Sequence, residues 1–298
     1  MSGTSNADYY VPHGTHWPII GSIGLSLTVI GIANFLHGTW SMTPMFVGLA
    51  IIIFMMYGWF GTVIDESIRG LYNKQVDMSF RWGMSWFIFS EVMFFAAFFG
   101  ALFYARMYSV PWLDGGSNND ATAQYLWPDF DAAWPLLTLP LGDKFAQARE
   151  VIGPWGLPAI NTAILLLSGW TVTLAHWALK RKDRDWLVYW LFATVALGFG
   201  FVFLQGVEYV HAYQDLNLRL DSGIYGSTFF MLTGFHGFHV TMGATMLLII
   251  MIRSAKGHFS PENHFAFEAV AWYWHFVEVR PVYICLLAIN CLFSRLRR

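Results

Sequence analysis

The sequence predicts an all-α fold, that of a polytopic membrane protein with seven transmembrane helices. Hydrophobic residues make up 56% of the 298-residue chain, whereas charged residues make up only 12%. A soluble protein carries about 25% charged residues. The charges that are present cluster between apolar stretches, and no tract of basic residues resembles a nucleic-acid-binding surface. This pattern excludes a soluble globular domain and indicates a helical protein that crosses a lipid bilayer.

Seven apolar stretches are long enough for one helix each to cross the hydrocarbon core, some of them with tilt. They cover residues 17–37, 42–64, 82–104, 157–179, 186–210, 227–252 and 267–293. Only a short turn at residues 38–41 separates the first two, which forces an antiparallel helix hairpin. The chain shows neither the alternation typical of strands nor the repeated halves of many transporters.

These stretches divide the chain into four segments. Residues 1–16 form a polar N-terminal segment, 17–64 the transmembrane hairpin, 65–81 a cytoplasmic connector and 82–298 a five-helix bundle. The bundle includes one long extracytoplasmic loop at residues 105–156, with six acidic and three basic side chains. Such a loop either covers neighbouring chains as an ordinary solvated surface or docks a basic partner.

Basic residues in the short loops predict the orientation in the membrane. With the N-terminus in the cytoplasm, nine basic residues lie in the cytoplasmic loops: Arg69, Lys74, Arg81, Lys180, Arg181, Lys182, Arg184, Arg253 and Lys256. The short loop on the other side contains only Arg219. The bias follows the positive-inside rule. Seven spans then place the C-terminus on the periplasmic side, although three arginines near that end oppose the rule.

Glu91 lies near the middle of the third apolar stretch. A carboxylate at that depth costs a few kcal/mol or more, so it is rare without a partner or a function. One interpretation is proton handling, and the other is a neutral glutamic acid that holds two helices together. We expect its partner to be His236 or His239, because the sixth stretch places both histidines at a similar depth.

Other polar residues within the stretches have spacings that place them on shared helix faces. We expect polar contacts between helices from six of them: His236, His239, Glu208, His211, Glu268 and His275. An alternative function for His236 and His239 is ligation of a haem or a metal ion. A haem, however, usually takes its two histidine ligands from facing helices, whereas these two histidines lie on the same stretch. We therefore expect this chain to contain no metal site, no catalytic residue and no bound cofactor.

Five motifs carry a resemblance to a known family. Residues 81–95 read RWGMSWFIFSEVMFF, residues 157–162 LPAINT, residues 221–231 DSGIYGSTFFM, residues 234–240 GFHGFHV and residues 272–277 WYWHFV. The fourth stretch adds Ser168, Gly169, Ala175 and His176, and the fifth adds Gln205, Glu208 and Tyr209. With these motifs in order along nearly the whole chain, the sequence resembles subunit III of cytochrome c oxidase of the bacterial aa3 type.

The resemblance implies a subunit of a proton-pumping terminal oxidase of the bacterial inner membrane that reduces oxygen to water. Haem a, haem a3, CuA and CuB would lie in partner subunits, with subunit I in direct contact, subunit II nearby and cytochrome c docking on the complex. The subunit would support proton uptake and the stability of the catalytic subunit. Glu91 matches the carbodiimide-reactive acid of the family.

The resemblance also implies a two-helix and a five-helix group around a cleft that holds structural phospholipids. The candidate lipid-binding residues are Trp59, Glu66, Arg69, Lys74 and Arg81. The chain departs from the family pattern at residues 59–62, which read WFGT, and at 73–75, which read NKQ. It departs again at Arg280 and Pro281, where the proline is expected to kink the last helix.

Three other functions fit parts of the sequence. A quinol oxidase would contain a very similar subunit III, so the electron donor stays open. A stand-alone proton-coupled transporter would use Glu91 as its coupling site. A haem-binding membrane reductase would need histidine ligands within the spans.

Overall fold

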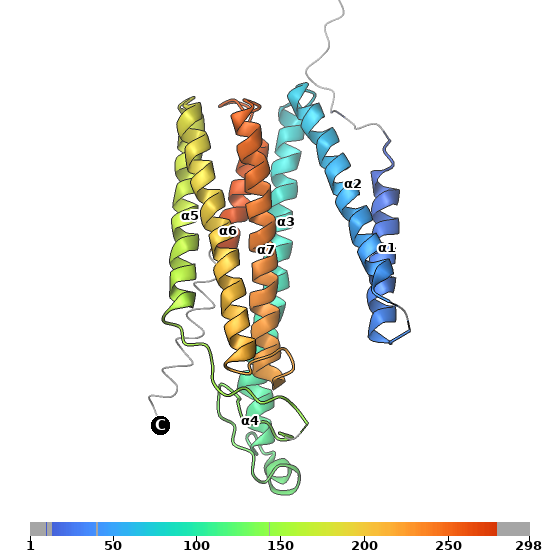
Figure 1. Ribbon diagram of the computed structural model, residues 1–298, viewed down its shortest axis with the longest axis vertical. Helices are drawn as coiled ribbons and strands as arrows, with labels where there is room; N and C mark the ends of the chain where they lie inside the picture. The colour runs from blue at the N-terminus through green and yellow to red at the C-terminus, as the bar shows by residue number, and fades with distance from the viewer. Residues whose placement is uncertain (1–9, 11–13, 40, 143, 279–298) are drawn as a thin grey trace, which may run out of the picture. The chain divides into compact units, whose positions relative to one another are not determined.

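The computed structural model describes residues 10, 14–39, 41–142 and 144–278 (Figure 1). This part of the chain is helical and contains no β-strand. Six helices are long and apolar enough to cross a membrane: α1 (Trp17–Leu36), α2 (Thr43–Ile68), α3 (Lys74–Tyr104), α5 (Leu157–Lys180), α6 (Arg184–Gln214) and α7 (Gly223–Ala255). The chain is therefore an all-α multi-pass membrane protein.

The seventh predicted span is described only at its start. Residues 265–278 are helical, and the rest of the predicted stretch, with Arg280 and Pro281, lies outside the described residues. The count of seven helices and the kink at Pro281 thus stay predictions.

Helix α3 is longer at both ends than the apolar stretch from which it was predicted. It begins at Lys74, inside the predicted connector, and continues through the π-helical turn η1 (Ala105–Ser109) into α4 (Val110–Leu113). A second π-helical turn, η2 (Thr122–Leu126), lies farther along the predicted loop. Aromatic contacts of Tyr108 with Tyr104 and Trp112 support the extension. Apolar composition predicts the part of a helix inside the membrane, whereas the helix itself continues into the interface.

Local signals set the ends of several helices. A proline with its fixed φ lies in the first turn of α1, α2 and α5, where its missing N–H costs no hydrogen bond. Helix α2 ends at Ile68 with Arg69 as its C-cap, and the next residue is Gly70, whose φ of +70° favours glycine. Helix α6 begins at Asp183, whose side chain accepts a hydrogen bond from the backbone N–H of Trp186 at 3.3 Å.

The chain divides into two compact units, Met1–Trp82 and Gly83–Arg298. In the first unit α1 and α2 pack against each other as the predicted antiparallel hairpin (Figure 1). Small residues make this contact possible, because a Cβ atom at Gly48 would collide with Thr28 and one at Gly31 with the backbone of Met45. Close backbone approach through glycine is the usual way for helices to associate in lipid, where the hydrophobic effect gives no driving force.

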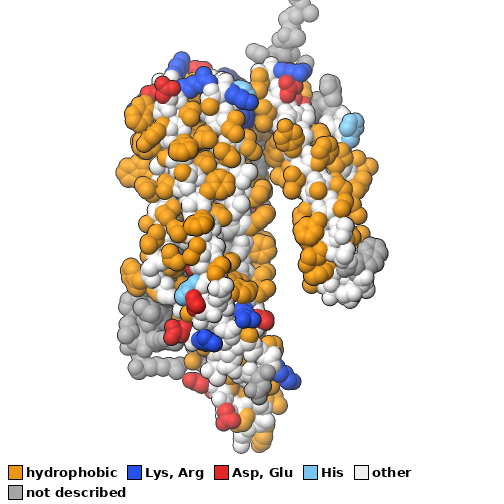
Figure 2. Space-filling view, in the orientation of Figure 1, with side chains coloured by type: hydrophobic (Ala, Val, Ile, Leu, Met, Phe, Trp, Pro, Cys, Tyr) orange, Lys and Arg blue, Asp and Glu red, His pale blue; other side chains and the backbone are white. Residues whose placement is uncertain are grey.

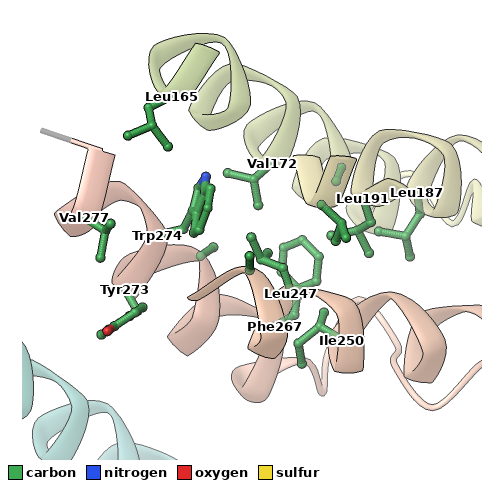
Figure 3. Close-up of a cluster of buried hydrophobic side chains, with 14 of the residues drawn as sticks. Leu165, Val172, Leu187, Leu191, Leu247, Ile250, Phe267, Tyr273, Trp274 and Val277 are labelled. Atoms are coloured by element: carbon green, nitrogen blue, oxygen red, sulfur yellow. The ribbon is translucent and has the colours of Figure 1, made fainter. Parts of the chain in front are cut away.

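The second unit has its core between α5, α6, α7 and residues 265–278 (Figure 3). Trp274 is fully buried at the centre of this core, and its indole N–H donates to Ser168 Oγ at 2.9 Å. The ring fits because Gly198 and Gly243 leave room for it; a Cβ atom at either position would lie 2.8 Å from the indole. Leu165, Val172 and Leu247 belong to the same buried cluster as Trp274. Helix packing in this unit is thus organised around one tryptophan.

Hydrogen bonds between helices pair several polar groups of this unit. Thr171 on α5 and Thr194 on α6 place their hydroxyl oxygens 2.7 Å apart. Gln205 on α6 donates to the carbonyl of Thr233 on α7 at 2.8 Å, and Tyr209 lies 2.7 Å from the Thr233 hydroxyl. Each bond removes the cost of an unpaired polar group in hydrocarbon.

The surface of the second unit separates apolar and charged side chains. Figure 2 shows hydrophobic side chains along the helices and a group of Lys and Arg side chains at one end. Lys180, Arg181, Lys182 and Arg184, at the connection between α5 and α6, are all exposed. The charges therefore flank the apolar helices, as the sequence pattern predicts.

Candidate functional site: a buried acid paired with a histidine

Glu91 on α3 is paired with His239 on α7. The His239 Nε2 atom lies 2.7 Å from Glu91 Oε2, and the two side chains expose only 10% and 20% of their surface, respectively. Of the two partners expected for Glu91, the structure places His239 in contact. The other histidine, His236, is buried one turn earlier on α7, where its ring meets Phe201 edge-on at 5.6 Å.

The protonation of the pair follows from its second contact. His239 Nδ1 lies 2.6 Å from the carbonyl oxygen of Phe235. A carbonyl only accepts hydrogen bonds, so Nδ1 carries the hydrogen and donates it. The proton of the Glu91–His239 contact then belongs either to the carboxyl group or to Nε2. Glu91 and His239 are therefore joined by one hydrogen bond, which contains a single proton.

Aromatic rings surround His239. Phe95 meets its ring edge-on at 5.2 Å, Phe238 meets it at 5.8 Å and Tyr273 stacks on it at 6.4 Å. The Tyr273 hydroxyl also donates to the His239 carbonyl at 3.4 Å. In these apolar surroundings electrostatic attraction is strong and an isolated charge is costly. The surroundings thus favour the direct contact between Glu91 and His239.

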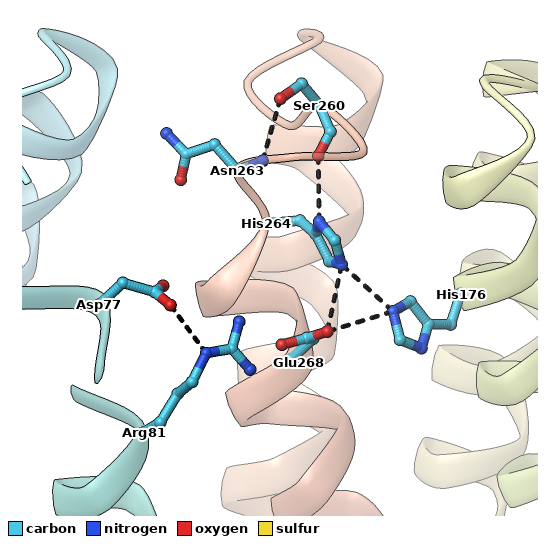
Figure 4. A network of polar contacts seen from close by, with 7 residues as sticks. All are labelled: Asp77, Arg81, His176, Ser260, Asn263, His264 and Glu268. Atoms are coloured by element: carbon cyan, nitrogen blue, oxygen red, sulfur yellow. Dashed lines mark hydrogen bonds and ion pairs between the residues drawn. The ribbon is translucent and has the colours of Figure 1, made fainter. Parts of the chain in front are cut away.

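A second group of polar side chains joins α5 to the segment that begins at His264 (Figure 4). His176 Nε2 and His264 Nε2 are 3.3 Å apart, and Glu268 Oε1 lies 3.6 Å from the first and 3.2 Å from the second. His264 Nδ1 contacts the Ser260 carbonyl oxygen at 3.1 Å. Glu268 thus has the expected contact with another helix, to His176.

Of the three remaining expected polar residues, His211 and His275 have hydrogen-bond partners in the structure. His211 is exposed and contacts Asp215 at 2.6 Å at the end of its own helix, so its contact is not between helices. Glu208, three residues before His211 on α6, is half-buried. His275 lies 2.6 Å from Glu278 in its own helix and 3.4 Å from Thr173 on α5. Shared helix faces therefore did not identify the partners of His211 and His275.

The candidate lipid-binding residues lie in the first unit. Trp59 is exposed and stacks on Phe60, and Lys74 is exposed at the start of α3. Arg69 forms an exposed ion pair with Asp65 at 2.8 Å, and Arg81 forms one with Asp77 at 2.8 Å. Exposed ion pairs between residues one turn apart contribute little to stability.

Glu66 differs from the other candidates because it has two internal partners. The hydroxyl of Tyr10 donates to Glu66 Oε1 at 3.0 Å, and that of Tyr72 donates to Oε2 at 2.7 Å. Partial burial, together with hydrogen bonding to the Glu66 carboxylate, raises the pKa of both phenols. Glu66 thus connects the N-terminal segment to the turn between α2 and α3.

Comparison with known proteins gives a consistent result. Residues 7–118 and 123–291 match the model of the family described as cytochrome c oxidase subunit III. The chain is 40% identical over 281 residues to cytochrome c oxidase subunit 3 of Marchantia polymorpha, with 94% of each chain covered. It is 39% identical to the subunit 3 of Drosophila melanogaster, covering 94% of this chain and 95% of the relative. For Gadus morhua the identity is 38%, with 91% and 92% covered. The chain that carries the buried Glu91–His239 pair therefore belongs to the cytochrome c oxidase subunit III family.

Proposed function

We propose that the chain is the third subunit of a proton-pumping terminal oxidase, in which it supports proton uptake and protects the catalytic subunit. The observation that carries the proposal is the Glu91–His239 pair, which holds one proton within an aromatic environment. Such a pair can store a proton and also connect α3 to α7. It contains no redox group, so its contribution to the reaction is indirect.

Family membership supports the other parts of the proposal. The haems and coppers of the complex belong to subunits I and II, with subunit I as the direct neighbour of this chain, and the chain itself performs no catalysis. Cytochrome c binds elsewhere on the complex as the electron donor. Basic residues of the connector, Arg69, Lys74 and Arg81, hold the phosphate groups of structural phospholipids. The membrane is the bacterial inner membrane, with the N-terminus in the cytoplasm and the C-terminus in the periplasm.

Selective removal of the chain from the purified oxidase tests this function. Haem absorption and the initial rate of oxygen reduction should be preserved, because the haems and coppers are assigned to other subunits. Activity should then decline during sustained turnover faster than in the intact complex. Re-addition of the chain should restore the lifetime of the enzyme. Immediate loss of haem on removal of the chain would contradict the proposal.

Two alternatives give different results in related experiments. A stand-alone proton-coupled transporter would move protons when the isolated chain is placed in liposomes, and Glu91→Gln would abolish the flux. A quinol oxidase complex would oxidise quinol and not reduced cytochrome c. Co-purification of the tagged chain with a haem–copper core, together with cytochrome c oxidation, supports the proposed function over both.

A further inference from the structure

We propose that His176, His264 and Glu268 form a binding site for one divalent transition-metal ion, for which Zn²⁺ is the best match. The site is separate from the Glu91–His239 pair, and the inference goes beyond the proposed function. It also departs from the expectation that the chain contains no metal site. Nε2 of each histidine and a carboxylate oxygen of Glu268 all lie within 4.8 Å of one another.

The spacing of the three atoms fits tetrahedral coordination. They are separated by 3.2, 3.3 and 3.6 Å. Bonds of about 2.0–2.2 Å with tetrahedral angles place neighbouring ligand atoms roughly 3.3–3.6 Å apart. An octahedral Mg²⁺ ion with bonds of about 2.0–2.1 Å would bring neighbouring ligands to roughly 2.8–3.0 Å. The geometry therefore favours a tetrahedral ion over an octahedral one.

The tautomer of His264 also fits a ligand. Its Nδ1–H donates to the Ser260 carbonyl, which leaves the lone pair of Nε2 directed at Glu268 and His176 (Figure 4). The turn is fixed in place because the backbone N–H of Asn263 donates to Ser260 Oγ at 3.1 Å. Donation from the second ring nitrogen to a carbonyl is the usual outer contact of a metal-bound histidine.

Two groups of the cluster, the His264 lone pair and the Glu268 carboxylate, are both acceptors. A metal ion would bind these two acceptors and His176 Nε2 at once. The side chains of His264, Glu268 and His176 expose 9%, 14% and 23% of their surface, respectively. His176 lies one turn before Lys180 at the end of α5, close to the polar connection to α6. An ion could thus enter from the aqueous side and keep one position for water.

The chemistry of the donors narrows the choice of ion. Two imidazoles and one carboxylate prefer borderline ions such as Zn²⁺ over Mg²⁺ or Ca²⁺, which take oxygen ligands. Two histidines and one glutamate are also the protein ligands of several open zinc sites.

Equilibrium dialysis of the purified complex against ⁶⁵Zn²⁺ tests the site. The wild-type complex should bind one equivalent more than complexes with His176→Ala, His264→Ala or Glu268→Gln, each of which should lower the affinity at least about tenfold. The matched control is His211→Ala, since His211 is an exposed histidine outside the cluster. It should bind zinc as the wild type does. Equal zinc uptake by the wild type and all three site variants would overturn the proposal.

A conservative variant covers the case in which the alanine variants fail to assemble. His176→Cys keeps a zinc ligand at the same position. Its zinc X-ray absorption spectrum should show one sulfur neighbour at about 2.3 Å that the wild type lacks. Unchanged spectra with full zinc uptake would place the bound ion elsewhere and contradict the assignment.

Discussion

Glu91 Oε2 and His239 Nε2 lie 2.7 Å apart and connect α3 to α7 through one hydrogen bond. Glu91→Gln removes the titratable proton and keeps a hydrogen bond to His239, whereas Glu91→Ala removes both, so comparison of the two variants separates the two contributions.

Glu91→Gln should preserve assembly, because the amide can still hydrogen-bond to His239, whereas Glu91→Ala leaves His239 Nε2 without that partner. In Glu91→Ala, loss of this hydrogen bond to a buried group should lower the stability of the folded protein by about 1–3 kcal/mol. We expect a hydrophobic carbodiimide to label the wild-type subunit and neither variant, and the alanine variant to release the subunit more readily in detergent. The measurements are mass-spectrometric labelling and subunit retention on size exclusion.

Glu208→Gln is the matched control, because it removes a half-buried acid on α6 outside the pair. It should leave labelling at Glu91 unchanged. Labelling that persists in Glu91→Gln would show that another acid reacts. Complete loss of proton pumping in that variant would mean that Glu91 belongs to the main proton path.

The sequence was sufficient for the six described membrane-spanning helices, and it narrowed the partner of Glu91 to His236 or His239, of which the structure shows His239. Long apolar runs identify transmembrane helices because unpaired backbone groups are costly in lipid. The partner could be narrowed to these two because both histidines lie at a depth similar to that of Glu91, and a buried acid needs a partner.

The cluster around Glu268 could not be inferred in the same way. His264 lies just before the last helix, in a polar connection that has no helical period, and it meets His176 across 88 residues of sequence. His275 shares a helix face with Glu268 but contacts Glu278, which is closer along the helix. Helical spacing indicates which residues can meet, whereas packing between helices decides which do.

Trp274→Ala should destabilise the second unit strongly. The substitution removes a fully buried indole at the centre of the core and leaves a large cavity, for which about 3–5 kcal/mol is typical. Trp274→Phe should cost much less, because Ser168 Oγ still donates to the Leu165 carbonyl at 2.6 Å. Thermal unfolding monitored by circular dichroism measures the stability of both Trp274 variants. The control is Trp59→Ala, at an exposed tryptophan. Equal effects at Trp274 and Trp59 would contradict the packing described here.

Arg69→Gln combined with Lys74→Gln should reduce the phospholipid that co-purifies with the subunit. Both side chains are exposed near the turn between α2 and α3, where cations can pair with phosphate headgroups. Quantitative lipid mass spectrometry after extensive delipidation measures the loss. Lys256→Gln, at the exposed end of α7, is the control and should retain lipid. An unchanged lipid content in the double variant would remove the connector from the proposed site.

The Tyr10–Glu66–Tyr72 contact should make the first unit sensitive to high pH. The folded state raises the pKa of both phenols, so it retains their protons at a pH where the unfolded chain releases them. The contribution to stability is therefore complete below about pH 10, the ordinary tyrosine value, and is lost as the pH rises through the folded values. Tyr72→Phe removes one of these phenols.

Ultraviolet titration near 295 nm, with unfolding measured at each pH, checks this prediction. The wild type should contain two more late-titrating tyrosines than Glu66→Gln, whose amide lacks the charge that opposes ionisation of the phenols. At neutral pH, Tyr72→Phe should be less stable than the wild type. Between pH 9 and 11, it should lose less of its free energy of unfolding than the wild type does. Each difference should be ~1 kcal/mol, the value of one hydrogen bond to a charged acceptor. Tyr57→Phe, at an exposed tyrosine on α2, is the control. Identical alkaline profiles of the wild type and Tyr72→Phe would show that Glu66 does not hold these phenols in the folded protein.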